Sequence, residues 1–208
     1  MKYNKNILEE KQKEQSSITS SLEEEILYKD FTKRRTISVL AVRGETNENK
    51  EFLFNHMMEQ LCLPNKNGEK LPITIKISNY GGEVESGFSI MSSILSARES
   101  GYEVLARVYG KAMSIAILPT IVSSKRYAQK NTKFMIHNPS ELAMGFYSAE
   151  QYKRTSEEMR SILKRYKDSI LKYTKIKKEV LERAFDRDAE LSFYSEEALE
   201  LGFIDGYI

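Results

Sequence analysis

The sequence predicts an α/β domain whose largely parallel sheet is covered by helices. Segments of strand length, β-branched or alternating in hydropathy, are followed by segments with apolar residues at helical spacing, and this order repeats three times before residue 125. At 208 residues the chain is long enough for one well-filled core and too short for two ordinary domains. We therefore expect one domain preceded by an arm.

Residues 1–30 form the expected arm. Residues 1–20 contain too few apolar side chains to pack unaided. The sequence Ser21-Leu-Glu-Glu24 has the spacing of a capping box, which predicts a short helix over Leu22–Tyr28. The arm is thus expected to be mobile or to form a short helix, and the domain to span residues 31–208.

Three strands and the helices between them make up the first part of the expected domain. The strands are Thr36–Val42, a segment with alternating Ile73, Ile75 and Ile77, and Tyr102–Tyr109. The helices carry the apolar stripes Phe54, Met57, Met58 and Leu61, and Val84, Phe88, Met91 and Leu95. Thr46-Asn47 can cap the first of these helices.

The segment Gly110-Lys-Ala-Met113 is expected to be a turn between the third strand and a helix. It would deliver Ser114 to the start of that helix, where backbone N–H groups point outward and the helix dipole favours negative charge. A serine at this position is also an ordinary N-cap, so Ser114 alone is compatible with a purely structural role.

Two short strands, a loop and a long helix follow. The strands are expected over Lys125–Gln129 and Lys133–Ile136, and the helix over Ser148–Tyr173. The apolar stripe of this helix is long enough to reach outside a compact domain and pack on another surface. The alternative is a surface helix that lies on its own core. A shorter helix is expected over Lys177–Phe185.

Composition excludes several classes of function. Lys and Arg number 32 against 30 Asp and Glu, so the net charge of +2 gives no reason to expect nucleic acid or an anionic membrane as partner. No apolar run approaches the length of a membrane helix, and the N-terminus has no signal-peptide pattern. The single cysteine, Cys62, cannot form an internal disulfide and belongs to no Cys/His cluster. We expect a cytoplasmic protein without a metal site.

Candidates for catalysis are few because the chain has only two histidines, His56 and His137. His56 lies on an expected helix and is interpreted as a surface or satisfied core residue. His137 lies where a strand meets a loop, a common place for a functional side chain. Gly81-Gly82 ends another strand and can present a backbone N–H to an oxyanion, although a glycine pair is commonly only a turn. Together these residues place a hydroxyl, an imidazole and N–H donors at the strand ends of one sheet.

Several motifs occur in the order and with the separations of a known family. They are Ile77-Ser-Asn-Tyr-Gly-Gly-Glu-Val-Glu-Ser-Gly87, Gly110-Lys-Ala-Met-Ser114, Met135-Ile-His-Asn-Pro139, Asp186-Arg-Asp188 and the segment from Ser195 to Asp205. From about Thr36 to the C-terminus the chain resembles ClpP, the proteolytic subunit of the Clp protease. The C-terminal motif is also similar to the ClpP-like head-maturation proteases of phages. The resemblance implies a ClpP/crotonase-like spiral of β-α-β units with a protruding handle over about residues 133–174.

The resemblance also implies roles for individual residues. Ser114 would be the nucleophile and His137 the general base, and Asp188 would be the carboxylate that fixes the imidazole tautomer. The backbone N–H groups of Gly82 and Ile115 would form the oxyanion hole. The expected activity is a serine endopeptidase that cleaves unfolded polypeptides or peptides inside an oligomeric chamber.

The expected partners follow from the same resemblance. The chain would form a homo-oligomeric ring, a heptamer or double heptamer, with Arg187 pairing across the interface between rings. No cofactor is expected in the chain itself, and ATP would enter only through a possible AAA+ unfoldase such as ClpX or ClpA.

Three other interpretations remain open from the sequence. A phage or prophage head-maturation protease would use the same residues on capsid or scaffold proteins. A catalytically silent assembly subunit is suggested by the N-terminal segment and by Pro119, which follows Ser114 closely. An acyl-CoA enzyme of the crotonase superfamily would share the β-α layout, but such enzymes do not need the Ser114, His137 and Asp188 set.

Overall fold

The computed structural model describes residues 36–37, 45–138, 148–185 and 190–208. The elements are, in chain order, β1 (Thr36–Ile37), α2 (Glu48–Leu61), β2 (Ile73–Asn79), α3 (Val84–Glu99), β3 (Val104–Met113), the 3₁₀ helix η2 (Ser114–Ala116), α4 (Ile117–Ile121), β4 (Lys125–Ala128), β5 (Lys133–His137), α5 (Ala149–Tyr173), α6 (Lys178–Phe185), β6 (Glu190–Tyr194), α7 (Ser195–Glu200) and β7 (Gly206–Tyr207). The helix expected over Leu22–Tyr28 and most of the first expected strand lie outside the described residues.

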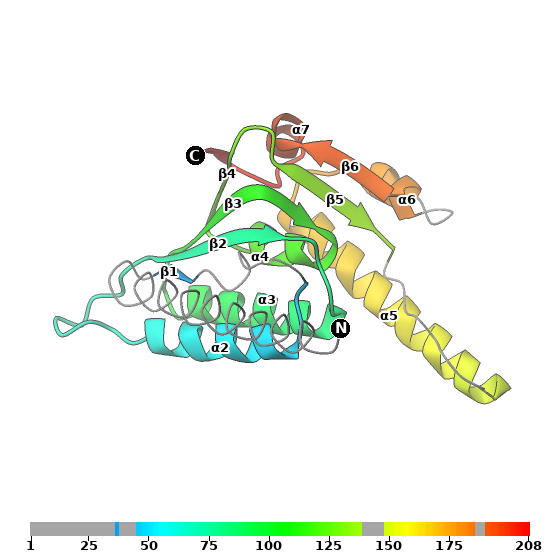
Figure 1. The fold of residues 1–208 in the computed structure, drawn as a ribbon, viewed down its shortest axis with the longest axis horizontal. Coiled ribbons are helices and arrows are strands. Elements are labelled where there is room, and N and C mark those ends of the chain that lie inside the picture. Colours follow the sequence, from blue (N-terminus) through cyan, green and yellow to red (C-terminus); the bar gives the residue numbers. More distant parts are fainter. Residues whose placement is uncertain (1–35, 38–44, 139–147, 186–189) are drawn as a thin grey trace, which may run out of the picture.

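The described strands form one seven-stranded sheet in which β1, β2, β3, β4 and β7 lie side by side. β5 pairs in parallel with β3, and β6 adds to it in antiparallel orientation. Helices α2 and α3 pack together along one face of the sheet (Figure 1). The expected α/β class with a largely parallel sheet is confirmed. β6, α7 and β7 were not predicted from the sequence.

The core lies between the sheet and the two helices on this face. Alternate residues of β2, Ile73, Ile75 and Ile77, are fully buried, as their spacing predicted. Asn47 caps α2 as expected, since its side-chain oxygen accepts the Lys50 N–H at 3.1 Å. β2 and the helices beside it therefore form a buried support for the ends of the strands.

Strand β3 corrects the prediction that Gly110–Met113 is a turn. Ile77 of β2 lies opposite Val108, but Asn79 lies opposite Ala112, so β3 carries two extra residues at this point. Gly110, with φ of +72°, absorbs this bulge in a conformation that suits glycine. The strand therefore continues beyond the glycine, and its second half pairs with β5 instead of β4.

Helix α5 has two dissimilar halves. Ser148 and Gln151 form a capping box at its start, where the helix extends away from the rest of the molecule (Figure 1). Its C-terminal half packs on the core, where Tyr166 and Ile170 are buried. The long helix expected over Ser148–Tyr173 is thus confirmed, with Ser148 as its cap.

An ion pair closes the far edge of the sheet, where β7 pairs with β4. The guanidinium of Arg126 donates from Nε to the Asp205 carboxylate at 3.1 Å, and its Nη1 donates to the carbonyls of Tyr173 and Gly202. One arginine thereby connects β4 to the end of α5 and to the C-terminal segment. Within the described ranges, no helix combines the length and apolar character that a membrane crossing requires.

Candidate active site

Ser114 and His137 meet at the end of the sheet. The Ser114 Oγ lies 2.8 Å from the His137 Nε2, which is hydrogen-bond distance. β3 and β5 run in parallel with Met113 opposite Met135, so both residues lie at the same ends of neighbouring strands. Both side chains are half-buried and therefore within reach of a bound peptide. If Oγ donates to Nε2, the imidazole carries its proton on Nδ1.

The backbone of Ser114 has an unusual conformation. Its φ is +53°, in the left-handed region that non-glycine residues seldom adopt. Met113, not Ser114, occupies the N-cap position of η2, and the Ser114 hydroxyl contacts His137 instead of capping the helix. The ordinary N-cap interpretation of Ser114 is therefore wrong. A strained residue held in contact with an imidazole is an arrangement that functional sites maintain.

Two glycines leave space for Ser114 and its neighbour. A Cβ on Gly81 would lie 2.6 Å from the Ser114 Cβ, and one on Gly87 of α3 would lie 2.2 Å from the Ile115 Cγ1. Gly81 also has φ of +112°, which a side chain would strain. Ser114 and Ile115 therefore pack directly against the backbone of these two glycines.

The backbone on both sides of Gly82 is held by hydrogen bonds. The Thr46 N–H donates to the Gly81 carbonyl, and the Glu83 N–H donates to the Thr46 carbonyl at 2.9 Å. These bonds fix the chain on both sides of Gly82, while within the described residues no group accepts the Gly82 N–H. A Cβ on Gly82 would lie 2.2 Å from the Thr46 carbonyl oxygen, so this close approach also requires glycine.

Ile115 lies in the first turn of η2, and its side chain is 3% exposed. The first N–H groups of a helix have no intrahelical acceptor, so the backbone of Ile115 can donate to a ligand. Pro119 is the third residue of α4, within the first turn, where a missing N–H costs no intrahelical bond. The structure thus accommodates Pro119 without interrupting the short helix.

Tyr166 of α5 also contacts the site, although the sequence predicted only an apolar stripe along this helix. Its hydroxyl donates to the Ser114 carbonyl oxygen at 2.8 Å, and its side chain is 2% exposed. Burial raises the pKa of the Tyr166 phenol far above its ordinary value, so the hydroxyl keeps its proton. The available signal was a single tyrosine in an otherwise aliphatic stripe, because a buried hydroxyl needs an acceptor.

The other residues singled out in the sequence are His56, Asp188 and Arg187. His56 is exposed on α2, in agreement with its interpretation as a surface residue. Asp188 and Arg187 lie outside the described residues. Tyr80, next to Gly81, has the Lys111 Nζ 3.6 Å from its ring centre, and the hydrogen bond and charge of this lysine lower the pKa of its phenol. Within the described part of the chain, no three metal-ligating side chains converge.

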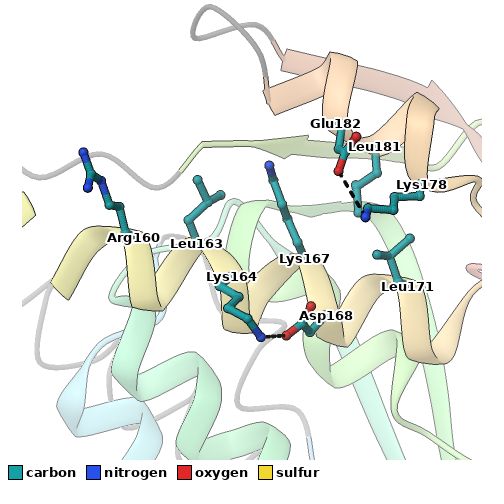
Figure 2. Close-up of a pocket in the computed structure, with 9 residues that line it drawn as sticks. All are labelled: Arg160, Leu163, Lys164, Lys167, Asp168, Leu171, Lys178, Leu181 and Glu182. Atoms are coloured by element: carbon teal, nitrogen blue, oxygen red, sulfur yellow. Dashed lines mark hydrogen bonds and ion pairs between the residues drawn. The ribbon is translucent and has the colours of Figure 1, made fainter. Parts of the chain in front are cut away.

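A groove of the described surface lies away from Ser114 and His137. One groove of about 290 Å³ runs between α5 and α6 over Leu163, Leu171 and Leu181 (Figure 2). Two ion pairs lie along it, between Lys164 and Asp168 at 2.6 Å and between Lys178 and Glu182 at 3.7 Å. Neither Ser114 nor His137 lines it. The convergence of hydroxyl and imidazole, and not the size of a hollow, therefore locates the candidate site.

A serine in contact with a histidine, at strand ends beside unpaired backbone N–H groups, is typical of serine hydrolases. The sequence profile of one family, described as Clp protease, matches residues 21–208. The chain therefore belongs to the Clp protease family, with the ClpP fold. The predicted enzyme class, a ClpP-type serine peptidase, is confirmed at this level.

Individual relatives agree with the family. The chain is 32% identical over 146 residues to the "ATP-dependent Clp protease proteolytic subunit 1" of Chlamydia trachomatis serovar D. The matched region covers 66% of this chain and 70% of that relative. The protein of the same name from C. trachomatis serovar A has the same identity and coverage. That of Chlamydia abortus is 29% identical over 140 residues.

Proposed function

We propose that the chain is a serine endopeptidase in which Ser114 is the nucleophile and His137 the general base. The contact of 2.8 Å between Oγ and Nε2 is the observation that carries this proposal. His137 accepts the Oγ proton as Oγ attacks the scissile carbonyl, and then donates it to the leaving amine. Water repeats the sequence on the acyl-enzyme and releases the second product.

The backbone N–H groups of Gly82 and Ile115 are proposed to bind the oxyanion. Both come from segments that glycine allows to approach closely, and neither position depends on a mobile side chain. Donors that are fixed before the substrate binds do not have to reorganise as negative charge develops. The strained backbone of Ser114 fits this role, because functional sites hold strained residues where the strain places a group in position.

Asp188 is proposed as the third member of the triad on the strength of the family resemblance. It would accept the Nδ1 proton of His137 and stabilise the imidazolium that forms during attack. If the Ser114 hydroxyl donates to Nε2, the imidazole carries its proton on Nδ1, where a carboxylate in this position would accept it.

The proposal extends to the substrate of the chain and to its assembly. Unfolded polypeptides or peptides would be cleaved inside a homo-oligomeric ring, a heptamer or double heptamer, with the exposed half of α5 as handle and Arg187 at the ring interface. The relatives are named as subunits of an ATP-dependent protease. An AAA+ unfoldase would accordingly supply ATP hydrolysis, and the chain itself would bind no cofactor.

The test is covalent labelling with a fluorescent fluorophosphonate. Oγ attacks phosphorus, the P–F bond breaks, fluoride leaves and His137 takes the Oγ proton. The wild-type chain is expected to be labelled on Ser114, and Ser114→Ala to lose the label. Ser123→Ala is the matched control, because Ser123 is buried just beyond the C-terminal end of α4 and its hydroxyl donates to the Pro119 carbonyl at 2.8 Å.

An assembled ring that takes no label at Ser114 would contradict the proposal and favour a silent assembly subunit. Size measurement by light scattering on the same sample separates this outcome from a failure to assemble. Equal labelling of the wild type and Ser114→Ala would place the nucleophile elsewhere in the chain.

A further inference from the structure

The contact between Tyr166 and the Ser114 carbonyl joins α5 to the nucleophile across 52 positions of sequence. The tyrosine ring packs edge-on against Phe185, with the ring centres 5.9 Å apart, and is almost fully buried. A phenylalanine would fill the same space, so packing alone does not account for the hydroxyl. The function of the hydroxyl must be sought at its acceptor.

The acceptor belongs to the most strained residue of the site. The left-handed conformation of Ser114 is unfavourable for an L-residue, and the surrounding contacts must hold it. Its carbonyl oxygen accepts two hydrogen bonds, one from the Ile117 N–H of the following turn and one from Tyr166. Both lone pairs of this oxygen are therefore used, and the carbonyl has one defined direction.

The direction of this carbonyl determines the direction of the next N–H. The peptide between Ser114 and Ile115 is trans and planar, so the Ser114 C=O and the Ile115 N–H point in opposite directions. A hydrogen bond that fixes the carbonyl also fixes the N–H. Accepting a hydrogen bond at the oxygen further polarises the peptide and strengthens its N–H as a donor.

We propose that Tyr166 is a positioning residue for peptide hydrolysis, which holds the Ser114 carbonyl and thereby aims the Ile115 N–H at the oxyanion. This inference rests on the proposed function, since it requires Ser114 as the nucleophile and Ile115 as an oxyanion donor. Tyr166 does not touch the substrate; it acts through the peptide plane. Because its hydroxyl keeps its proton, it remains a donor over the whole working range of pH.

The test compares two tyrosine-to-phenylalanine variants. Tyr166→Phe removes the hydroxyl that donates to Ser114. Tyr102→Phe removes a hydroxyl of the same kind, since the side chain of Tyr102 is 4% exposed and its hydroxyl donates to the Cys62 carbonyl at 2.6 Å. Tyr102 lies before the start of β3, at the opposite end of this strand from Ser114.

The rate of labelling by the fluorophosphonate is measured at several probe concentrations and resolved into kinact and KI. Tyr166→Phe is expected to lower kinact about tenfold, the effect of losing one net hydrogen bond in the transition state. KI, the final extent of labelling and the midpoint of the pH dependence are expected to match the wild type. Tyr102→Phe is expected to label as fast as the wild type, with a thermal stability similar to that of Tyr166→Phe.

The outcomes separate the two levels of the proposal. If the wild type reacts at Ser114 and Tyr166→Phe reacts equally fast, the positioning role is wrong and the proposed nucleophile stands. A loss confined to the final extent of labelling, with kinact unchanged, would likewise reduce Tyr166 to a structural residue. A wild type that does not react at Ser114 overturns both.

Discussion

The first half of β3, Val104–Val108, and its second half, Lys111–Met113, differ in neighbours and in backbone conformation. The first half lies between β2 and β4 in a regular parallel ladder, and its alternate side chains are fully buried. The second half follows the bulge at Gly110 and pairs with β5. It leads directly to Ser114, which has a positive φ angle, as do the nearby Gly81 and Gly82.

This difference separates two functions within one strand. Regular pairing and burial in the first half contribute stability, while the second half uses a bulge and close glycine contacts to place Ser114 against His137. Changes in the first half should therefore alter the free energy of unfolding and leave labelling of the folded protein intact. Changes around the second half should slow labelling and leave the free energy of unfolding largely unchanged.

His137→Ala should have the largest effect on the reactive end. Without the imidazole, the Ser114 hydroxyl has no base, and the labelling rate should fall by at least about 10⁴-fold. His56→Ala is the control, because His56 is the other histidine of the chain and is exposed on α2. Labelling of His137→Ala at the wild-type rate would remove the imidazole from the mechanism.

Ile75→Ala should have the next largest effect, and on stability. Ile75 is fully buried in β2 opposite Ala106 in the first half of β3, so its truncation should cost about 2–5 kcal/mol of unfolding free energy. Denaturant unfolding measures this loss. The labelling rate of the folded protein should remain unchanged, and a fall in that rate without unfolding would contradict the separation of the two halves.

Gly87→Ala tests how tightly the reactive end is seated. The new methyl group would lie 2.2 Å from the Ile115 Cγ1, which is too close for two carbon atoms, and would displace this side chain, so labelling should slow by about a hundredfold. In an exposed helix position the same change would be stabilising. Adding Ile115→Ala makes room for the methyl group and should restore part of the rate. No recovery in the double variant would show that the clash is not the cause.

Asp205→Asn should have the smallest effect, a small loss of stability that depends on pH. Burial alone would raise the pKa of Asp205, but the hydrogen bonds and charge of Arg126 outweigh it and lower the pKa below 3.8. The ion pair therefore stabilises the fold above this pH and loses its contribution as the pH falls through the lowered pKa. The loss should not exceed about 1 kcal/mol, because the carboxylate is partly exposed.

Thermal unfolding of the wild type and Asp205→Asn at a series of acidic pH values measures this effect. The two curves should differ at neutral pH and converge below pH 3.8. A difference that widens as the pH falls would have the wrong sign for an ion pair.

Much of the fold could be predicted because its elements follow local patterns. Alternation in β2, the stripes of α2 and α3, and the capping residue Ser148 of α5 are all decided by near neighbours in sequence. The bulge was not predictable, because a glycine that breaks a strand and one that bulges it look alike. β6, with one buried residue, Phe193, has too little pattern of its own, and its pairing with β5 decides its structure.

The candidate site shows the same limit. Residue types indicated Ser114 and His137, and the family resemblance joined them, but only the folded chain gives their contact. The Tyr166 contact joins segments far apart in sequence through a single hydroxyl, and no local pattern carries such information. Asp188 and Arg187 remain predictions.

The close approach of Gly81 to Ser114 also has a consequence for the gene. Every other amino acid carries a Cβ, which at this position would lie 2.6 Å from the serine Cβ. Any missense change in that codon therefore disturbs Ser114, the proposed nucleophile, and only synonymous changes leave it intact. The neighbouring Tyr80, whose side chain is 54% exposed, is under no such limit. In a deep mutational scan read out by proteolysis, one codon should admit no substitution while the codon before it admits many.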